Sequence, residues 1–392
     1  MERPHVMILA GEASGDAHAA EFVEQLKLLQ PDIRLSGMGS QQMQRAGVDV
    51  FFDSSIIAVV GLIEVLRHWG DIKKAMAIVK QRLEQTRPDL LVLVDYPEFN
   101  LKMARHAREL GIKVLFYISP QVWAWRPKRI HKIGSLIDHM AVIFGFEQRY
   151  YEDAGIPVSF VGHPLVDKVK VDTDRESLRT KLGISGTDRV VGLFPGSRHS
   201  EISRLLPLML DTAKLMQQRD PKLVFLLPVA STLDHDEISR QCASAGIGIL
   251  ISRDKIYEVI RCCDVIASCS GTVTLEIGLL GVPMCIVYKM SGLSYSIMKR
   301  LITIPHIGLA NIVADGPVVR EFLQQQANPT SISAELFELM ENAEYRAEVV
   351  SGLERVRENL GAGDGARNMA QLVLSLIEEK SEGGKNGDSG AF

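Results

Sequence analysis

The sequence predicts an α/β protein made of two doubly wound, Rossmann-like domains. Short apolar runs without polar alternation, such as 90–95 and 114–118, are typical of parallel strands buried on both faces. Between them, apolar residues recur at helical spacing, as they do over 99–110. The pattern restarts after the charged stretch 168–179, and a length of 392 residues suits two such domains.

In the first half, residues 6–10 are predicted to form a strand, followed by a glycine-rich turn and a helix over 18–29. After the helix at 99–110, Gly111 stands where a C-terminal cap is expected. The second half predicts five strands, at 189–194, 223–227, 247–251, 265–268 and 283–287. Helical patterns dominate from residue 317 to residue 379.

These elements suggest the domain boundaries. We expect a first domain over 1–167, a linker over 168–188 and a second domain over 189–355. Residues 356–380 are expected to form C-terminal helices that pack across the domains. The polar segment 381–392 is expected to be a disordered tail.

The bulk composition excludes several protein classes. A formal net charge of -4 argues against nucleic acid as a partner. The five cysteines form no CxxC pair, so we expect buried free thiols in a reducing, cytoplasmic protein rather than disulfides or a zinc site. No signal peptide is recognised, and no apolar run approaches the roughly 20 residues of a membrane-spanning helix, so any membrane contact should be peripheral.

A strand followed by Pro195-Gly196-Ser197-Arg198 opens the second domain. Gly196 allows a close approach of the backbone, the following helix offers free N–H groups, and Arg198 matches phosphate oxygens. The alternative is a capped turn with a surface arginine. Later, Ser270-Gly271-Thr272 precedes another helix, with Glu276 one turn further. Because both loops follow strands of one sheet, we predict a nucleotide diphosphate between them, with Glu276 on the ribose hydroxyls.

The sequence lacks two common nucleotide-binding motifs and gives little support for a metal site. Neither a Walker loop nor a GxGxxG fingerprint is present. Two D-x-D triplets, 172–174 and 234–236, are of a kind that can hold a metal on a nucleotide sugar. Because one lies in the predicted linker and the other opens a helix, we interpret both as solvated or capping acids. We therefore expect no metal and no other cofactor.

The first domain carries three polar loops at the predicted carboxyl ends of its strands. The first loop contains Glu12, Ser14, Gly15 and Asp16, the second begins at Asp95, and the third contains Gln121. Because such ends share one edge of a parallel sheet, we expect these residues to face a ligand together. Asp95 is a candidate general base, and the alternative is an N-cap for the following helix.

The segment 55–66 is unusually apolar but too short to cross a bilayer. It is predicted to be either a core helix or a membrane-docking helix. For docking, the candidate contacts are Val59, Val60, Leu62, Ile63, Leu66, Trp123 and Trp125. Nearby cations such as Arg126 and Lys128 would add attraction to an anionic membrane.

Four motifs carry a family resemblance: GEASGD, SPQVWAWRPKR, FPGSR and SGTVTLE. In this order and spacing they resemble the lipid-A-disaccharide synthase family, from about residue 6 to residue 376. That family, glycosyltransferase family 19, belongs to the GT-B glycosyltransferases, so the resemblance implies two domains facing a central cleft.

The resemblance also implies a reaction. The donor would be UDP-2,3-diacylglucosamine, the acceptor 2,3-diacylglucosamine 1-phosphate, and the products a β-1,6-linked disaccharide 1-phosphate and UDP. It implies that Asp95 and Arg198 matter for activity and that Asn311 lies near the donor. It further implies peripheral attachment to the cytoplasmic face of the inner membrane through the region of Val59, and a homodimer that exchanges C-terminal segments.

Together these inferences predict an inverting transfer in which Asp95 activates the acceptor hydroxyl and Arg198 stabilises the departing UDP. Three rivals stay open. One is a GT-B transferase or UDP-sugar epimerase that acts on a soluble sugar, another is a kinase or NTPase, and the third is a non-catalytic, nucleotide-binding membrane scaffold.

Overall fold

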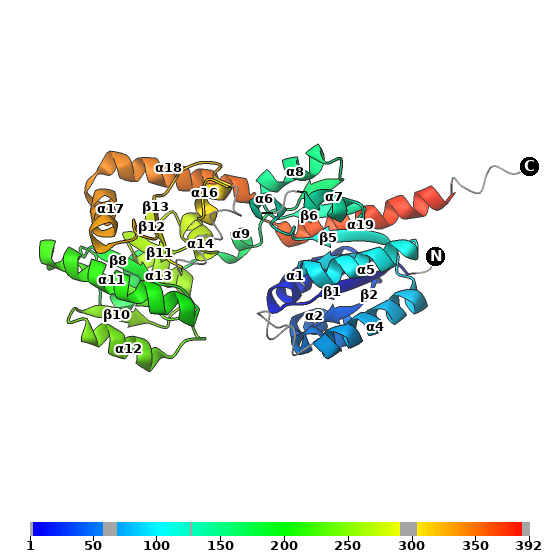
Figure 1. Cartoon of the computed structure of the whole chain (residues 1–392), viewed down its shortest axis with the longest axis horizontal. Helices are drawn as coiled ribbons and strands as arrows, with labels where there is room; N and C mark the ends of the chain where they lie inside the picture. Colours follow the sequence, from blue (N-terminus) through cyan, green and yellow to red (C-terminus); the bar gives the residue numbers. More distant parts are fainter. Residues whose placement is uncertain (1–2, 58–68, 126–127, 291–303, 386–392) are drawn as a thin grey trace, which may run out of the picture. The chain divides into compact units, whose positions relative to one another are not determined.

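The computed structural model describes residues 3–57, 69–125, 128–290 and 304–385. Its contacts divide the chain into two compact units, which we call the first unit (Met1–Pro164 with Gly361–Phe392) and the second unit (Leu165–Leu360). Each contains one parallel sheet flanked by helices (Figure 1). The predicted α/β class with two parallel sheets is thereby confirmed.

The first unit is built on a seven-stranded sheet in the order β3-β2-β1-β4-β5-β6-β7. Its strands are β1 (His5–Ala10), β2 (Arg34–Gly39), β3 (Asp49–Asp53), β4 (Leu90–Val94), β5 (Lys113–Tyr117), β6 (His139–Val142) and β7 (Val158–Phe160). Ala10 pairs with Val94, and Val94 with Tyr117, so β1, β4 and β5 end at one edge. The loops that follow them therefore start side by side.

The helices of the first unit cover this sheet. They are α1 (Ala13–Leu29), α2 (Gln41–Ala46), α4 (Trp69–Thr86), α5 (Pro97–Glu109), α6 (Val122–Trp125), α7 (Arg129–Gly134), α8 (Gln148–Asp153) and α19 (Gly365–Lys385), with 3-10 turns η1 (Ser54–Ile56) and η2 (Gly145–Glu147). Every residue of β1 and β4 is buried. This accounts for their unbroken apolar sequences.

The C-terminal helix α19 packs on α1 and contacts β4 (Figure 1). Lys113 anchors it, because its Nζ donates to the Leu376 carbonyl at 3.1 Å and to Glu379 at 2.7 Å. Two boundaries therefore differ from the prediction. Residues 356–360 end a helix of the second unit, and 381–385 are still helical because a helix already formed by packing extends readily into polar residues.

The second unit has six parallel strands in the order β10-β9-β8-β11-β12-β13. They are β8 (Val190–Phe194), β9 (Val224–Pro228), β10 (Ile249–Ser252), β11 (Val265–Cys269), β12 (Met284–Tyr288) and β13 (Glu321–Leu323). Its helices are α9 (Leu165–Lys168), α10 (Arg175–Lys181), α11 (His199–Arg219), α12 (His235–Ser244), α13 (Ile256–Cys262), α14 (Val273–Leu279), α16 (Leu309–Val313), α17 (Pro329–Glu341) and α18 (Ala343–Leu360). The strand order is that of a dinucleotide-binding sheet, whose ligands bind where the order reverses, here between β8 and β11.

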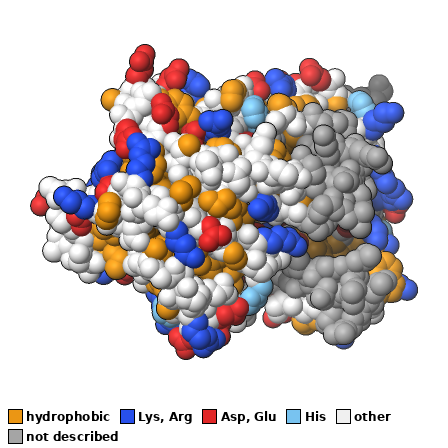
Figure 2. Space-filling view, turned by 60° about the vertical axis from the view of Figure 1, so that its left-hand side comes forward, with side chains coloured by type: hydrophobic (Ala, Val, Ile, Leu, Met, Phe, Trp, Pro, Cys, Tyr) orange, Lys and Arg blue, Asp and Glu red, His pale blue; other side chains and the backbone are white. Residues whose placement is uncertain are grey.

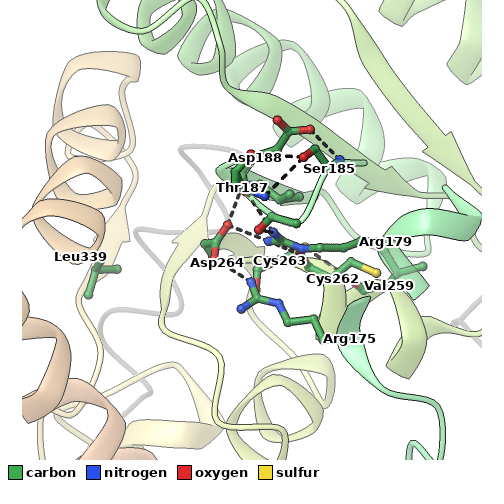
Figure 3. Close-up of polar contacts among 12 residues, drawn as sticks. Arg175, Arg179, Ser185, Thr187, Asp188, Val259, Cys262, Cys263, Asp264 and Leu339 are labelled. Carbon is green, nitrogen blue, oxygen red and sulfur yellow. Dashed lines mark hydrogen bonds and ion pairs between the residues drawn. The ribbon is translucent and has the colours of Figure 1, made fainter. Parts of the chain in front are cut away.

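The predicted linker 168–188 belongs to the second unit. Its helix α10 begins at an N-cap formed by Asp174, whose side chain accepts the Ser177 N–H. Arg179 on α10 is buried and bonds to carbonyls and a carboxylate beside β11 (Figure 3). The charges that suggested a linker thus anchor this segment to the sheet.

All five cysteines are free and buried, as predicted. No helix in the described ranges has the length and apolar character needed to span a bilayer. On the face shown in Figure 2, Lys and Arg side chains are interspersed with Asp and Glu, which fits the small net charge of -4.

Candidate functional site

The carboxyl ends of four neighbouring strands in the second unit surround a pocket of about 600 Å³. Its walls come from the ends of β8, β9, β10 and β11, at 194–198, 228–231, 253–254 and 269–273. All the residues predicted to bind the nucleotide except Asn311 line it: Gly196, Ser197, Arg198, Ser270, Gly271, Thr272 and Glu276. The two predicted phosphate loops therefore meet at one site.

The PGSR loop is shaped around Glu201. Gly196 has a φ of +117°, and a Cβ there would overlap the Glu201 carboxylate, so this position requires glycine. Glu201 Oε2 accepts the N–H groups of Ser197 at 2.9 Å and Arg198 at 3.1 Å. The two amides expected to bind phosphate thus bind a carboxylate in this structure. Glu201 stands three residues after the N-cap residue Arg198 and accepts its N–H, as the glutamate of a capping box does.

The guanidinium of Arg198 is mostly exposed and lies 3.3 Å from Glu201 Oε1. Its charge is therefore held at the lip of the pocket rather than in a buried ion pair. An exposed arginine attached to a preformed loop is available to an incoming anion, and its fork geometry suits phosphate oxygens.

The opposite wall carries Ser270, Thr272 and Glu276. The Ser270 hydroxyl donates to the Ile307 carbonyl at 3.2 Å, whereas the side chain of Thr272, at the N-cap position of α14, makes no capping bond. Glu276 accepts the Tyr257 hydroxyl at 3.3 Å through Oε1. Burial raises the pKa of the Glu276 carboxyl. A partly buried acceptor one turn below the loop is suited to hydroxyl donors such as those of a ribose.

Asn311 has a different role from the one predicted. Its Nδ2 donates to the Val319 carbonyl and to Glu321 Oε1, each at 2.8 Å, and its Oδ1 accepts the N–H groups of Val318 and Val319. The amide is buried and fully used, so Asn311 does not line the pocket. Sequence reasoning instead missed Glu321, which holds the backbone of 307–308 beside Ser270.

The two D-x-D triplets act as helix caps. Asp174 caps α10, and Asp234 caps α12 by accepting the N–H groups of Asp236 and Glu237. This confirms the interpretation of these acids as capping residues. Within the described part of the chain, no three His, Cys, Asp or Glu side chains are grouped to hold a metal ion.

In the first unit, Asp95 and Glu12 lie at the edge where β4 and β1 end. Asp95 is half-buried, and burial raises the pKa of its carboxyl against the lowering effects of the Tyr96 N–H and of His18. Burial and then the charge of Asp95 raise the pKa of Glu12. A carboxylate with a raised pKa binds protons more tightly than a solvated one and is therefore a better general base.

The helix-cap alternative for Asp95 finds no support in the structure. The N-cap of α5 is Tyr96, one residue later, and its side chain makes no capping bond. Asp95 instead continues the edge of the sheet, because its N–H donates to the Tyr117 carbonyl at 2.9 Å. Its carboxylate is thus not used in starting the helix.

The first loop is only partly as predicted. Glu12 is half-buried, Ser14 is exposed, and Gly15 packs against Ala10 and Val94. Asp16 differs from the prediction, because it is buried and its carboxylate accepts N–H groups of Ser40, Gln42 and Met43. Asp16 therefore caps α2 rather than facing a ligand.

The predicted membrane contacts separate into three groups. Val59, Val60, Leu62, Ile63 and Leu66 lie outside the described residues, as does the side chain of Trp125. Trp123 is buried and packs edge-on against Phe146, with ring centroids 5.0 Å apart, so it is a core residue and not a membrane contact. Gln121, two residues before it, is exposed.

The loop with Trp123 rests on a buried carboxyl group. Trp123 Nε1 donates to Glu147 Oε1 at 2.9 Å, and the hydroxyls of Ser119 and Tyr151 lie 2.6 Å apart beside them. Among the described residues, Glu147 Oε2 has no hydrogen-bond partner. Burial raises the pKa of Glu147 to about 8, against the lowering effect of the Trp123 N–H. Glu147 is therefore a neutral acid at pH 7.

This burial predicts a pH-dependent stability. Between the ordinary carboxyl pKa of 4.5 and about 8, folded Glu147 holds a proton that the unfolded chain has lost. Its contribution to the unfolding free energy therefore falls by up to about 1.4 kcal/mol per pH unit as pH rises. Glu147→Gln, which keeps the acceptor for Trp123, should remove this slope in urea titrations at pH 5–8. The exposed Glu152→Gln should keep it, and equal slopes for wild type and Glu147→Gln would mean that Glu147 is ionised when folded.

The chain is similar to known proteins along nearly its whole length. Residues 6–374 match the family model described as lipid-A-disaccharide synthetase. A lipid-A-disaccharide synthase of Geobacter metallireducens is 48% identical over 375 residues, which are 96% of this chain and 98% of the relative. The match extends over both candidate sites, and the resemblance seen in the four motifs is confirmed.

Solved structures agree on the fold. A UDP-GlcNAc 2-epimerase from Neisseria meningitidis bound to UDP-GlcNAc aligns with a TM-score of 0.61 at 12% identity, covering 96% of this chain and 100% of that chain. The glycotransferase of kitacinnamycin aligns with a TM-score of 0.63 at 14% identity, with the same coverage. At these identities the likeness shows the architecture alone, which is GT-B.

Proposed function

This chain belongs to the lipid-A-disaccharide synthase family, and from that premise we propose the reaction that it catalyses. As a member of this family it is a glycosyltransferase, which transfers a sugar unit from a sugar nucleotide to a glycosylated lipid and releases the nucleotide. The donor proposed here is UDP-2,3-diacylglucosamine and the acceptor is 2,3-diacylglucosamine 1-phosphate. The products are the β-1,6-linked disaccharide 1-phosphate and UDP.

The pocket at the ends of β8–β11 is the observation that carries the donor assignment. The diphosphate lies between the Arg198 guanidinium and the turn 270–272, where negative charge grows as UDP departs. Glu276 receives the ribose hydroxyls through Oε2, since Oε1 already accepts the Tyr257 hydroxyl. Because Glu201 occupies the Ser197 and Arg198 amides, the guanidinium and the second turn carry most of the diphosphate contact.

Asp95 is the proposed general base for the acceptor. Its carboxylate takes the proton of the 6-hydroxyl, directly or through one water, as the oxygen attacks the anomeric carbon from the side opposite UDP. This single displacement inverts the anomeric configuration. Glu12, Ser14 and Gln121, which are half-buried or exposed, are proposed to contact the acceptor.

The test is a direct assay with both lipid substrates in detergent and EDTA, with UDP and disaccharide measured by mass spectrometry. Equal amounts of disaccharide and UDP would support the reaction and its independence of added metal. UDP without disaccharide would keep the donor and overturn the acceptor. If neither product forms with EDTA or with magnesium, the substrate assignment is wrong.

We further propose that the enzyme attaches peripherally to the anionic, cytoplasmic face of the inner membrane, and that it forms a homodimer. Ile56 belongs to the apolar segment 55–66 and Trp69 lies three residues after it; both are large exposed apolar side chains, at 49% and 45%. Lys73 and Lys102 each place an ammonium 5.7 Å from the centre of the Trp69 ring. An aromatic ring among cations is suited to an anionic lipid headgroup region.

The membrane proposal predicts the behaviour of one double variant. Ile56→Ser with Trp69→Ser should weaken binding to phosphatidylglycerol vesicles roughly 10–100-fold, because only about half of each side chain is exposed and inserting that half contributes about 0.7–1.5 kcal/mol per residue. Cosedimentation at low and high salt measures it. Leu28→Ser removes an apolar side chain that is 74% exposed and should bind like wild type. Unchanged binding of the double variant would remove this surface from the membrane contact.

A further inference from the structure

The turn that carries Asp95 has an unusual backbone. Asp95 and Tyr96 are consecutive non-glycine residues with φ of +47° and +49°. Such left-handed conformations cost on the order of 1–3 kcal/mol each and persist only where the surroundings hold them. At the end of the adjacent strand β5, Ile118 has a φ of +68°. The edge that presents Asp95 is therefore held in place by other contacts.

The side chain of Asn100 makes three of the contacts that hold this turn. Asn100 on α5 is completely buried, and its Nδ2 donates to the carbonyl of Asp95 at 2.7 Å, of Val94 at 3.2 Å and of Leu9 at 3.4 Å. Leu9 lies in β1 and Val94 in β4. A single amide group thus links the ends of two neighbouring strands and the backbone of Asp95.

The orientation of this amide carries a cost. Oδ1 of Asn100 is buried and has no partner among the described residues. An unsatisfied buried acceptor costs about 1–3 kcal/mol, which an apolar residue of similar size would avoid. Rotating the amide by 180° would place Oδ1 against three carbonyl oxygens, so the donors fix the observed orientation. Asn100 therefore supplies N–H donors to the Asp95 turn at a cost in stability that an apolar side chain would not have.

A second contact fixes the turn from the other side. The Tyr96 ring lies on Gly11, where any Cβ would overlap it, and its hydroxyl donates to the Ile57 carbonyl at 3.3 Å. The ring also packs against Phe99, with centroids 5.9 Å apart. Tyr96 is thus fixed between the end of β1 and α5. Because Asp95 directly precedes Tyr96, these contacts also restrict the backbone of Asp95.

We propose that Asn100 positions Asp95. Asn100 holds the strained turn so that the Asp95 carboxylate faces the acceptor side of the first unit. This inference rests on the proposed role of Asp95. Asn100 does not contact the reacting atoms. It acts by restricting the backbone from which the carboxylate projects, and a base displaced by about 1 Å can lose roughly 10²-fold in rate.

The test is a double-variant cycle on the full-length enzyme. Asn100→Ala should lower kcat roughly 10–100-fold with an unchanged KM for the UDP donor, and Asn100→Ser, which keeps one donor, should lose less. If Asn100 acts through Asp95, the pair Asp95→Asn with Asn100→Ala should be no slower than Asp95→Asn alone. Asn368→Ala, which loses the hydrogen bond from the side-chain amide to the Val161 carbonyl, should keep kcat and serves as the control.

The outcomes separate the two proposals. Full activity of Asp95→Asn would overturn the role of Asp95 itself. A slow Asp95→Asn beside a wild-type kcat for both Asn100 variants would overturn only the positioning role. Multiplying losses in the double variant would show that Asn100 acts independently of Asp95, which would also overturn the positioning role. Circular dichroism establishes which variants are folded. If Asn100→Ala does not fold, Asn100→Ser is used in the cycle in its place.

Discussion

Asp95→Asn is expected to lower turnover roughly 10²–10⁴-fold while the fold survives, which is the usual contribution of a general base. The amide keeps the size of the carboxylate but cannot take a proton at neutral pH. The helix that follows should be unaffected, because Asp95 makes no capping bond in α5. The measurement is kcat with both lipid substrates saturating, together with thermal unfolding of each variant.

The same variant should change the pH profile. A base must be deprotonated, so a pKa of Asp95 raised by burial moves the acidic limb of the kcat profile to higher pH than an exposed aspartate would give. Asp95→Asn should lose that limb. Glu98→Gln alters an exposed carboxylate three residues away, paired with Arg129, and should keep both rate and limb. Near wild-type turnover of Asp95→Asn would remove Asp95 from the mechanism.

The fold was predictable to the extent that buried strands leave an unbroken apolar sequence. β1, β4, β8 and β11 are buried along their whole length and were found within one or two residues. β13 has only three residues, and partly exposed edge strands such as β7 lack that signal. These short elements are defined by pairing with a neighbour, which local sequence does not encode.

The site was predictable where chemistry follows strand ends. Arg198, Thr272 and Glu276 were placed at one pocket because parallel strands bring their carboxyl ends together. Asp16 and Asn311 were misassigned, since a carboxylate that caps a distant helix and an amide that braces a loop look like ligand groups in sequence. Only the three-dimensional partners distinguish the two uses.

Arg179→Ala is expected to destabilise the second unit by about 3–5 kcal/mol, the usual loss when one partner of a buried ion pair is removed. The Arg179 side chain is only 5% exposed. It donates to Asp264 Oδ2 at 2.8 Å, to the Cys262 carbonyl at 2.9 and 3.0 Å and to the Asp188 carbonyl at 2.9 Å (Figure 3). Its loss would take these donors from the Cys262 and Asp188 carbonyls, while Asp264 would keep the Arg175 guanidinium and the Val190 N–H.

Arg175 provides the matched comparison, because it pairs with the same carboxylate from a more exposed position. Its Nη2 lies 2.6 Å from Asp264 Oδ1, but its side chain is 41% exposed, so Arg175→Ala should cost only about 0–1 kcal/mol. Urea unfolding of both variants measures the difference. Equal small losses would mean that 168–188 behaves as the linker its composition suggests. The predicted large asymmetry would instead show that this segment is held to β11, the strand whose end forms one wall of the donor pocket.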